Sequence, residues 1–108
     1  MFNTALVALD LEPAERPIVD CLPDLQNWGV QRVVLTHVIQ VGYMQGAALA
    51  HEQDYSDWLE KLAQPLRDAG LEVAVSVRGS GLPADEILKA ATEHQADLIV
   101  IGSRGHNL

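Results

Sequence analysis

The sequence predicts an α/β fold, an open, parallel, doubly wound sheet that forms one domain over residues 1–108. Two observations predict it. Short apolar segments rich in β-branched residues alternate along the chain with longer segments of helical spacing. Apolar residues make up 48% of the chain and charged residues 20%, a balance typical of proteins that bury a core. Strands that alternate with helices are joined by right-handed crossovers, which make neighbouring strands parallel.

Four segments are expected to be strands. Residues 4–9 and 97–101 are mainly apolar runs, as in strands that are covered on both faces. Residues 32–39 are rich in β-branched side chains. Residues 71–77 alternate apolar side chains with polar or small ones, so this strand is expected to have a more exposed face and to lie at the sheet edge.

The first connection between strands is expected to be a helix that begins near Pro13, because proline suits the first turn. Gly29 suits its C-terminal cap, and Pro23 is expected to break or kink it. Its apolar positions at helical spacing are Ile18, Val19, Leu22 and Leu25. Cys21 falls in the same segment and is expected to be a small buried side chain.

Two further helices follow. One is expected over residues 47–69 with Gly70 as its stop, and Pro65 predicts a kink near Lys61 because it removes a backbone donor. The apolar face of this helix comprises Leu59, Leu62, Ala63 and Leu66. The other is expected to begin at Pro83. Its expected buried face comprises Ile87, Leu88, Ala91 and Thr92.

Charge and cysteine content restrict the partners and the compartment. The formal net charge of −8 repels nucleic acid and anionic membrane surfaces, so a phosphate-bearing ligand needs local groups to hold it. Cys21 is the only cysteine, which excludes an intrachain disulfide and fits a reducing compartment. Asp10 and Glu12 interrupt the first apolar run, so neither a signal peptide nor a membrane span is expected. These features predict a cytoplasmic protein.

The predicted topology places the ligand site at one rim of the sheet. In open α/β sheets, ligands bind beyond the carboxyl ends of the strands, where the strand order reverses. Asp10 and Val38 stand at the ends of the first two strands, and residues 102–105 follow the last. Gly102 and Gly105 would let backbone N–H groups approach an anion closely, to which Arg104 would add charge. Spacing alone leaves a second interpretation open, in which the glycines only form a tight turn.

Four features in combination resemble the universal stress protein family. They are Asp10 at the first strand end, the Leu-Thr-His-Val sequence at 35–38, the Gly79, Pro83 and Ile87 spacing, and residues 96–105. The last segment, Ala-Asp-Leu-Ile-Val-Ile-Gly-Ser-Arg-Gly, is the most specific part of a resemblance that spans the chain. The resemblance implies a five-stranded sheet that is flavodoxin-like, or adenine nucleotide alpha hydrolase-like, of which four strands are visible in this sequence.

The resemblance also implies a function and a site. One subgroup of the family binds ATP together with Mg²⁺ and does not hydrolyse it robustly, and the other subgroup binds no ATP. Family members frequently dimerise through the last strand. Carried over by position, Asp10 and Val38 border the adenosine, and Gly102 and Gly105 meet the ribose and phosphates. The residues implied for nucleotide binding are Asp10, Val38, Ile101, Gly102, Ser103, Arg104 and Gly105.

Two features depart from the family pattern. Asp10 is followed by the bulky Leu11 and the acidic Glu12, where the family often has Gly-Ser. The chain ends at Leu108, before the distal Gly-Ser or Gly-Thr, so the domain is expected to be C-terminally incomplete. The fourth strand would then be an uncovered apolar edge, and we expect self-association through it, as a homodimer or a tandem-domain pair.

Other kinds of chemistry have less support in the sequence. The histidines lack metal-ligand spacing, and His37 is expected to be a hydrogen-bonded core residue. Neither Ser80 nor Ser103 lies in a nucleophile elbow, and no P-loop motif is present. The large aromatic residues are expected to be packing residues. They are Trp28, Tyr43, Tyr55 and Trp58.

Three functions therefore remain. The favoured one is an adenine-nucleotide-binding stress-response or signalling domain, indicated by Asp10 and by Gly102 and Gly105. The alternative is a family member that binds no ATP and serves as a dimerisation or protein-interaction module, which Leu11 and Glu12 favour. An enzyme of related architecture has little specific support, and the fold alone does not decide among the three.

Overall fold

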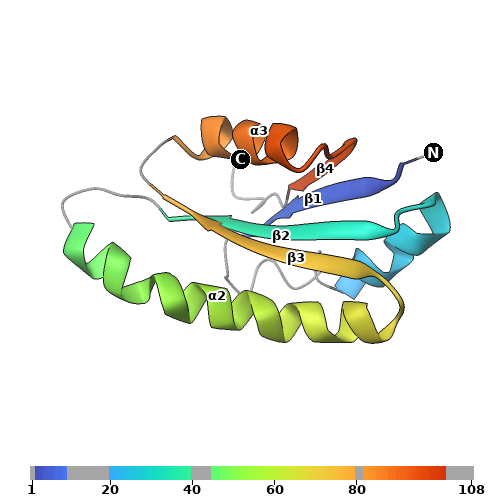
Figure 1. Ribbon diagram of the computed structural model, residues 1–108, viewed down its shortest axis with the longest axis horizontal. Helices are drawn as coiled ribbons and strands as arrows, with labels where there is room; N and C mark the ends of the chain where they lie inside the picture. Colours follow the sequence, from blue (N-terminus) through green and yellow to red (C-terminus); the bar gives the residue numbers. More distant parts are fainter. Residues whose placement is uncertain (1, 10–19, 40–44, 80–81, 102–108) are drawn as a thin grey trace, which may run out of the picture.

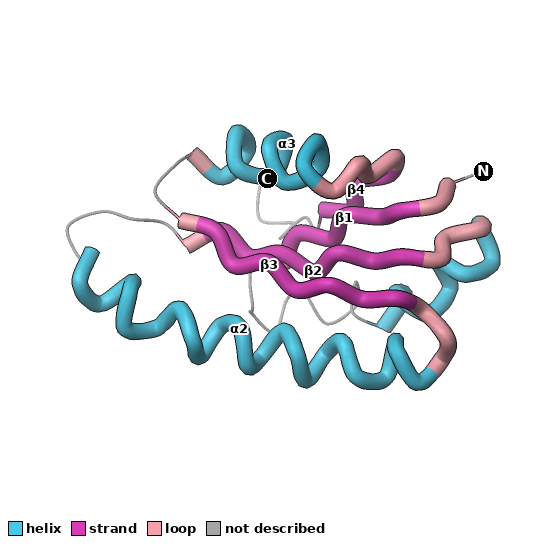
Figure 2. Tube along the Cα trace, viewed as in Figure 1, coloured by secondary structure: helices cyan, strands magenta, loops and turns pink. Residues whose placement is uncertain are grey.

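The computed structural model describes residues 2–9, 20–39, 45–79 and 82–101. Its elements are β1 (Thr4–Ala8), η2 (Leu22–Trp28), β2 (Arg32–Val38), α2 (Gln45–Asp68), β3 (Glu72–Arg78), α3 (Pro83–Glu93) and β4 (Leu98–Ile101). The strands pair in parallel as one sheet in the order β3-β2-β1-β4. α2 and α3 lie on opposite faces of this sheet (Figures 1 and 2). The predicted open, parallel, doubly wound α/β fold is confirmed, and β3 lies at an edge, as expected.

The strand order explains why the helices lie on opposite faces. From β1 to β3 the chain moves across the sheet in one direction, and from β3 it returns past β2 and β1 to form β4. Right-handed crossovers in opposite directions place their helices on opposite faces. α2 connects β2 to β3, and α3 connects β3 to β4. The strand order therefore reverses between β1 and β4.

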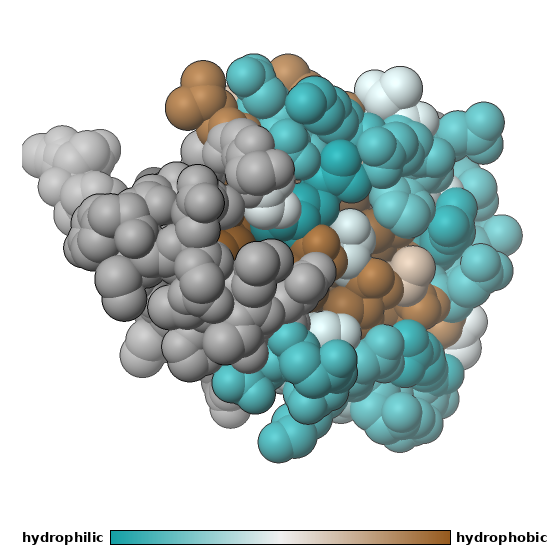
Figure 3. Space-filling view, turned by 60° about the vertical axis from the view of Figure 1, so that its left-hand side comes forward, coloured by the Kyte–Doolittle hydropathy of each residue, from teal (hydrophilic) through white to brown (hydrophobic). Residues whose placement is uncertain are grey.

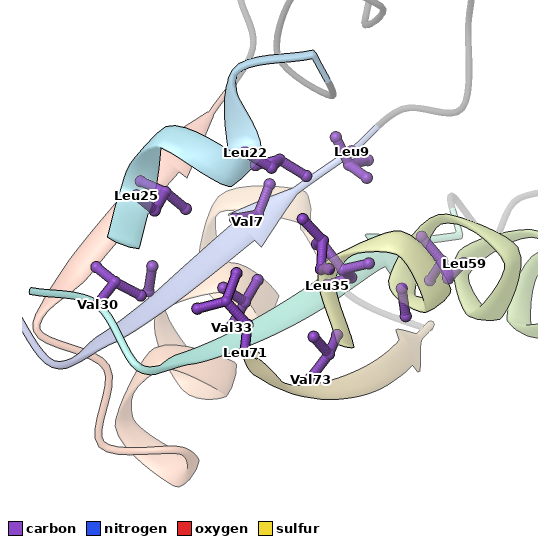
Figure 4. Close-up of a cluster of buried hydrophobic side chains, with 13 residues drawn as sticks. Val7, Leu9, Leu22, Leu25, Val30, Val33, Leu35, Leu59, Leu71 and Val73 are labelled. Atoms are coloured by element: carbon purple, nitrogen blue, oxygen red, sulfur yellow. The ribbon is translucent and has the colours of Figure 1, made fainter. Parts of the chain in front are cut away.

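The larger part of the core lies between the sheet and α2 (Figure 4). Val7 and Leu35 point to this face from neighbouring strands, and Leu59 meets them from α2. All three side chains are fully buried. The predicted apolar face of the long helix is confirmed, because Leu59, Ala63 and Leu66 are buried and Leu62 packs against them. α2 continues through Pro65, and the kink expected near Lys61 stays a prediction.

The second part of the core, beneath α3, uses small side chains. Ala90 and Ala91 of α3 are buried against Leu6 and Val34 of the sheet, and Ile87 packs beside them. The predicted buried face was therefore wrong in part, since Leu88 is 59% exposed and Thr92 is also exposed. The physical reason is helical geometry: Leu88 lies about 200° around the helix axis from Ala90, at about 100° per residue.

The connection before β2 follows its prediction only in part. Its described part begins α-helical at Asp20 and Cys21 and continues as the 3₁₀ helix η2, with Pro23 near the start of η2. The break expected at Pro23 is thereby confirmed, although the 3₁₀ form of the following segment was not predicted. Leu22 and Leu25 fill the core, whereas Cys21 is exposed, so its predicted burial was wrong. The tight turn directs the two leucines to the sheet and leaves the thiol on the outside. Gly29 caps the helix as predicted, with φ of 93°, a value that favours glycine.

Candidate functional site

The carboxyl ends of all four strands meet at one rim of the sheet, on the left in Figure 1. Ala8 near the end of β1 is paired in register with Thr36 of β2 and with Ile101 of β4. Val38 at the end of β2 is paired with Arg78 of β3. Two predicted site residues, Val38 and Ile101, thus lie at this rim. The other predicted site residues, Asp10, Gly102, Ser103, Arg104 and Gly105, lie outside the described residues and stay predictions.

Val38 and Ile101 stand on either side of β1. Residues paired in register across parallel strands point to the same face, and side chains alternate along each strand. Ile101 therefore shares the α3 face with Ala8 and Thr36, and Val38 shares it as well. At the usual spacing of parallel strands, the backbones of β2 and β4 are about 10 Å apart with β1 between them, and Val38 lies two residues beyond Thr36, which is in register with Ile101. The rim thus has two apolar side chains that flank the point where β1 ends.

His37 lies at the same end of β2, on the opposite face from Val38. The residue is 9% exposed, and its Nδ1 lies 2.8 Å from the Leu9 carbonyl oxygen. The Tyr55 ring of α2 packs against it, with 4.6 Å between the ring centroids. The prediction of a hydrogen-bonded core histidine is confirmed, and Tyr55 is a packing residue as expected. Trp28, in contrast, is 56% exposed, so its predicted packing role was wrong.

Arg78 at the end of β3 is held by two carboxylates of α3. Its Nε donates to Glu86 at 3.1 Å, and its Nη1 donates to Glu93 at 2.8 Å. The hydrogen bond from Arg78 holds the pKa of the Glu86 carboxyl below its ordinary value, and the pKa of Glu93 is lowered in the same way. Glu93 and Glu86 in turn raise the pKa of Arg78. Because the guanidinium is neutralised within the fold, its charge is not free to hold a phosphate at the rim.

Neither the Arg78 cluster nor the partner of the His37 hydrogen bond was identified from the sequence. Glu86 and Glu93 are seven residues apart, which is two helical turns, so they share one side of α3. Two acidic residues at this spacing, after a strand that ends in arginine, are the signal that could have predicted the cluster. The His37 bond has no comparable signal, because Leu9 is 28 positions away in the sequence.

Asp97 holds the sheet together at the rim opposite the candidate site. It was predicted to begin the fourth strand, but β4 begins at Leu98. Its carboxylate accepts from the N–H of Thr4 at 2.9 Å and from the N–H of Asn3 at 3.0 Å. These bonds to Asn3 and Thr4 lower the pKa of the Asp97 carboxyl. The start of β1 is thereby fixed beside the start of β4.

The lowered pKa of Asp97 predicts a stability that falls in acid. The unfolded chain binds this proton at the ordinary carboxyl pKa, whereas the folded protein binds it only at a lower pH. The stabilisation is thus complete above the ordinary carboxyl pKa and is lost as pH falls through the lowered value. We expect Asp97→Asn to lower the melting temperature at pH 7, with a smaller difference from the wild type near pH 3. Asp24→Asn, at an exposed position of η2, is the control and should keep the wild-type pH profile. A constant difference for Asp97→Asn across this range would contradict the prediction.

In the part of the chain that the structure describes, no group of three or more His, Cys, Asp or Glu side chains could hold a metal ion. None of the described helices is long and apolar enough to cross a membrane.

The fold and rim define a class of α/β proteins whose ligands bind at the carboxyl ends of a doubly wound parallel sheet. The sequence matches the universal stress protein family over residues 1–108, and the chain belongs to that family. The resemblance inferred from the sequence is thereby confirmed. No curated protein sequence matches the chain significantly.

Solved structures of universal stress proteins have the same fold. A family member from Burkholderia pseudomallei has a TM-score of 0.78 and 24% identity, with 94% of this chain and 81% of that chain covered. A family protein from Arabidopsis thaliana with AMP bound has a TM-score of 0.63 and 18% identity, with coverage of 96% and 78%. A universal stress protein in complex with cAMP also has a TM-score of 0.63, with 17% identity and coverage of 91% and 74%. At these identities the similarity establishes the fold alone.

Proposed function

We propose that this chain binds an adenine nucleotide at the rim between the carboxyl ends of β1 and β4, and that the bound nucleotide regulates association with partners instead of being consumed. The observation that carries the proposal is the strand order, which reverses between these two strands. Ligands of doubly wound sheets bind at such a reversal. In the sequence, Asp10 follows β1 and the segment 102–105 follows β4. The AMP and cAMP bound to two related structures support an adenine nucleotide as the ligand.

The charge of the chain restricts how phosphates are bound. With a net charge of −8, the protein repels a polyanion at long range. The negative charge of the nucleotide phosphates therefore has to be compensated by groups at the site. Mg²⁺ on ATP, the backbone N–H groups near Gly102 and Gly105, and the Arg104 guanidinium would supply this compensation. Arg78 is already paired with two carboxylates and is not assigned this role. A cytoplasmic location, where ATP is abundant, is part of the proposal.

The test is a calorimetric titration of the full chain with Mg-ATP, AMP and cAMP. We expect saturable binding of at least one of these nucleotides at up to millimolar concentration. Gly102→Val should weaken it at least tenfold, because a branched side chain would keep the phosphates from the backbone. Equal melting temperatures of the variant and the wild type would show that the fold is intact. Absence of heat with all three ligands would refute nucleotide binding, and steady phosphate release would favour an enzyme.

A second candidate function is a dimerisation module that binds no nucleotide. It is favoured by β4, which lies at one edge of the sheet formed by the described residues. Ile99 and Ile101 of this strand are 37% and 61% exposed. Independently of this strand, hydrophobic side chains reach the surface between two hydrophilic regions on the face of the molecule that Figure 3 shows. An exposed apolar edge strand favours pairing with a second copy. Sedimentation distinguishes the two functions: a dimer at micromolar concentration that is unaffected by nucleotide favours the module, whereas a nucleotide-dependent state favours the first proposal.

A further inference from the structure

The side chain of His37 connects the ends of β1 and β2. Its Nδ1 lies 2.8 Å from the carbonyl oxygen of Leu9, the residue directly after β1. A carbonyl oxygen only accepts hydrogen bonds, so Nδ1 carries the proton and donates it. The ring is buried, and the contact joins positions that are 28 residues apart. The structure thus assigns the Nδ1–H tautomer to His37.

This bond lies where β1 leaves the sheet. The Leu9 N–H donates to the Thr36 carbonyl oxygen at 2.9 Å, which extends the pairing of β1 and β2 one step beyond Ala8. The next polar group, the Leu9 carbonyl, is held by the side chain of His37. Because a peptide unit is planar, holding this carbonyl sets the direction in which the backbone leaves the strand.

Tyr55 fixes the ring of His37 from the helix layer. The two rings are 4.6 Å apart between centroids and inclined by 48°. α2, which carries Tyr55, packs on β2 and β3. The orientation of His37 is therefore determined by β1 and by α2 together, so the rim is held by three elements at this point.

We propose that His37 is a positioning residue of the nucleotide site, which fixes the ends of β1 and β2 relative to each other through the Leu9 carbonyl. This inference rests on the proposed function. Val38, the predicted nucleotide contact, follows His37 directly and points to the opposite face of the sheet. His37 therefore acts on the ligand through the backbone of the rim and does not touch it.

The experiment compares two amides at position 37 in the full chain. In asparagine the side-chain nitrogen is two bonds from Cβ, as Nδ1 is in histidine. His37→Asn therefore keeps an N–H donor within reach of the Leu9 carbonyl oxygen. His37→Gln places its nitrogen one bond further away, in the position of Nε2. His94, at the C-terminus of α3 and outside the candidate rim, provides the matched controls His94→Asn and His94→Gln.

We expect His37→Gln to raise the Kd for Mg-ATP or AMP about tenfold, the effect of one lost hydrogen bond. His37→Asn should stay within about twofold of the wild type, and both His94 variants should bind like it. Melting temperatures are measured in parallel, because a purely structural role would lower stability in both His37 variants and leave affinity unchanged. Wild-type affinity in folded His37→Gln, or equal losses in both His37 variants, would overturn the proposal.

Two further measurements do not depend on nucleotide binding. Nitrogen NMR of the wild-type protein should show the Nδ1–H tautomer at His37, and the Nε2–H tautomer would overturn the inference even if a variant failed to fold. Hydrogen exchange at the amides of Leu9 and Ile39, which donate to Thr36 and Arg78, should be faster in His37→Gln and restored in His37→Asn. If the wild type binds no nucleotide, the proposed function fails. The hydrogen-exchange pattern then decides whether His37 fixes the ends of β1 and β2. Exchange in His37→Gln that equals the wild type would refute this positioning role.

Discussion

Leu35→Ala is expected to lower the free energy of unfolding by about 2–5 kcal/mol, because it removes a large side chain from the core and leaves a cavity. Leu35 is fully buried on β2, which lies between β1 and β3. It belongs to the cluster that joins the sheet to α2. Domains of this size are stable by about 5–15 kcal/mol, so the loss is a large fraction of the total. Urea unfolding of the full chain, followed by circular dichroism, measures it.

The matched control is Leu88→Ala, the same substitution on α3. Leu88 is 59% exposed, so the stability is expected to change by less than about 0.5 kcal/mol. The pair also tests which side of α3 packs on the sheet, since the sequence alone predicted Leu88 to be buried. A loss for Leu88→Ala equal to that for Leu35→Ala would contradict the observed packing.

The sheet could be predicted from the sequence because its strands are buried on both faces. Such strands are short apolar runs rich in Val, Ile and Leu, and this signal is local. Residues 32–39 were predicted as a strand, and β2 covers Arg32–Val38. The edge position of β3 also followed from its alternation of exposed and apolar residues.

The exposure of individual helical residues was harder to predict, because it depends on how each helix approaches the sheet. Leu88 is more hydrophobic than Ala90, yet Ala90 is the buried residue. Cys21 was expected in the core, but the 3₁₀ turn that follows it gives the core positions to Leu22 and Leu25. Hydrophobicity alone does not identify the buried side when a helix packs through small side chains.

The candidate site was predictable only as far as topology determines it. Topology alone brings the ends of β1, β2 and β4 to one rim, and Val38 and Ile101 lie there. The bond from His37 to Leu9 and the pairing of Arg78 with α3 depend on side-chain placement across elements. Such tertiary contacts have no local pattern in the sequence. The rim was therefore predictable, whereas the residues that hold its backbone were not.

The two faces of the sheet differ in the size of the buried side chains that the helices contribute. Large side chains such as Leu59 fill the space beneath α2, whereas Ala90 and Ala91 lie beneath α3. Small residues let a helix lie close to the sheet. The packing of α3 on the sheet also places Glu86 beside Arg78 at the end of β3, where the carboxylate is buried. The packing of α3 and the charge balance of the rim are thus coupled.

Ala90→Leu is expected to destabilise the protein by about 1–3 kcal/mol, because a larger side chain overpacks the layer beneath α3. Ala90 is fully buried against the sheet, so the helix must move outward or the side chain must adopt a strained rotamer. Outward movement would also lengthen the hydrogen bond between Arg78 and Glu86. Urea unfolding measures the first effect, and NMR titration of the Glu86 carboxyl, whose pKa should rise toward its ordinary value, measures the second.

Ala84→Leu makes the same change at an exposed position of α3 and should leave both the stability and the Glu86 titration close to the wild type. Equal effects of the two substitutions would contradict a close packing of α3 through Ala90. A destabilised Ala90→Leu protein with an unchanged Glu86 titration would show that α3 absorbs the larger side chain without moving from Arg78. The coupling between helix packing and the rim would then be refuted, although the overpacking itself would stand.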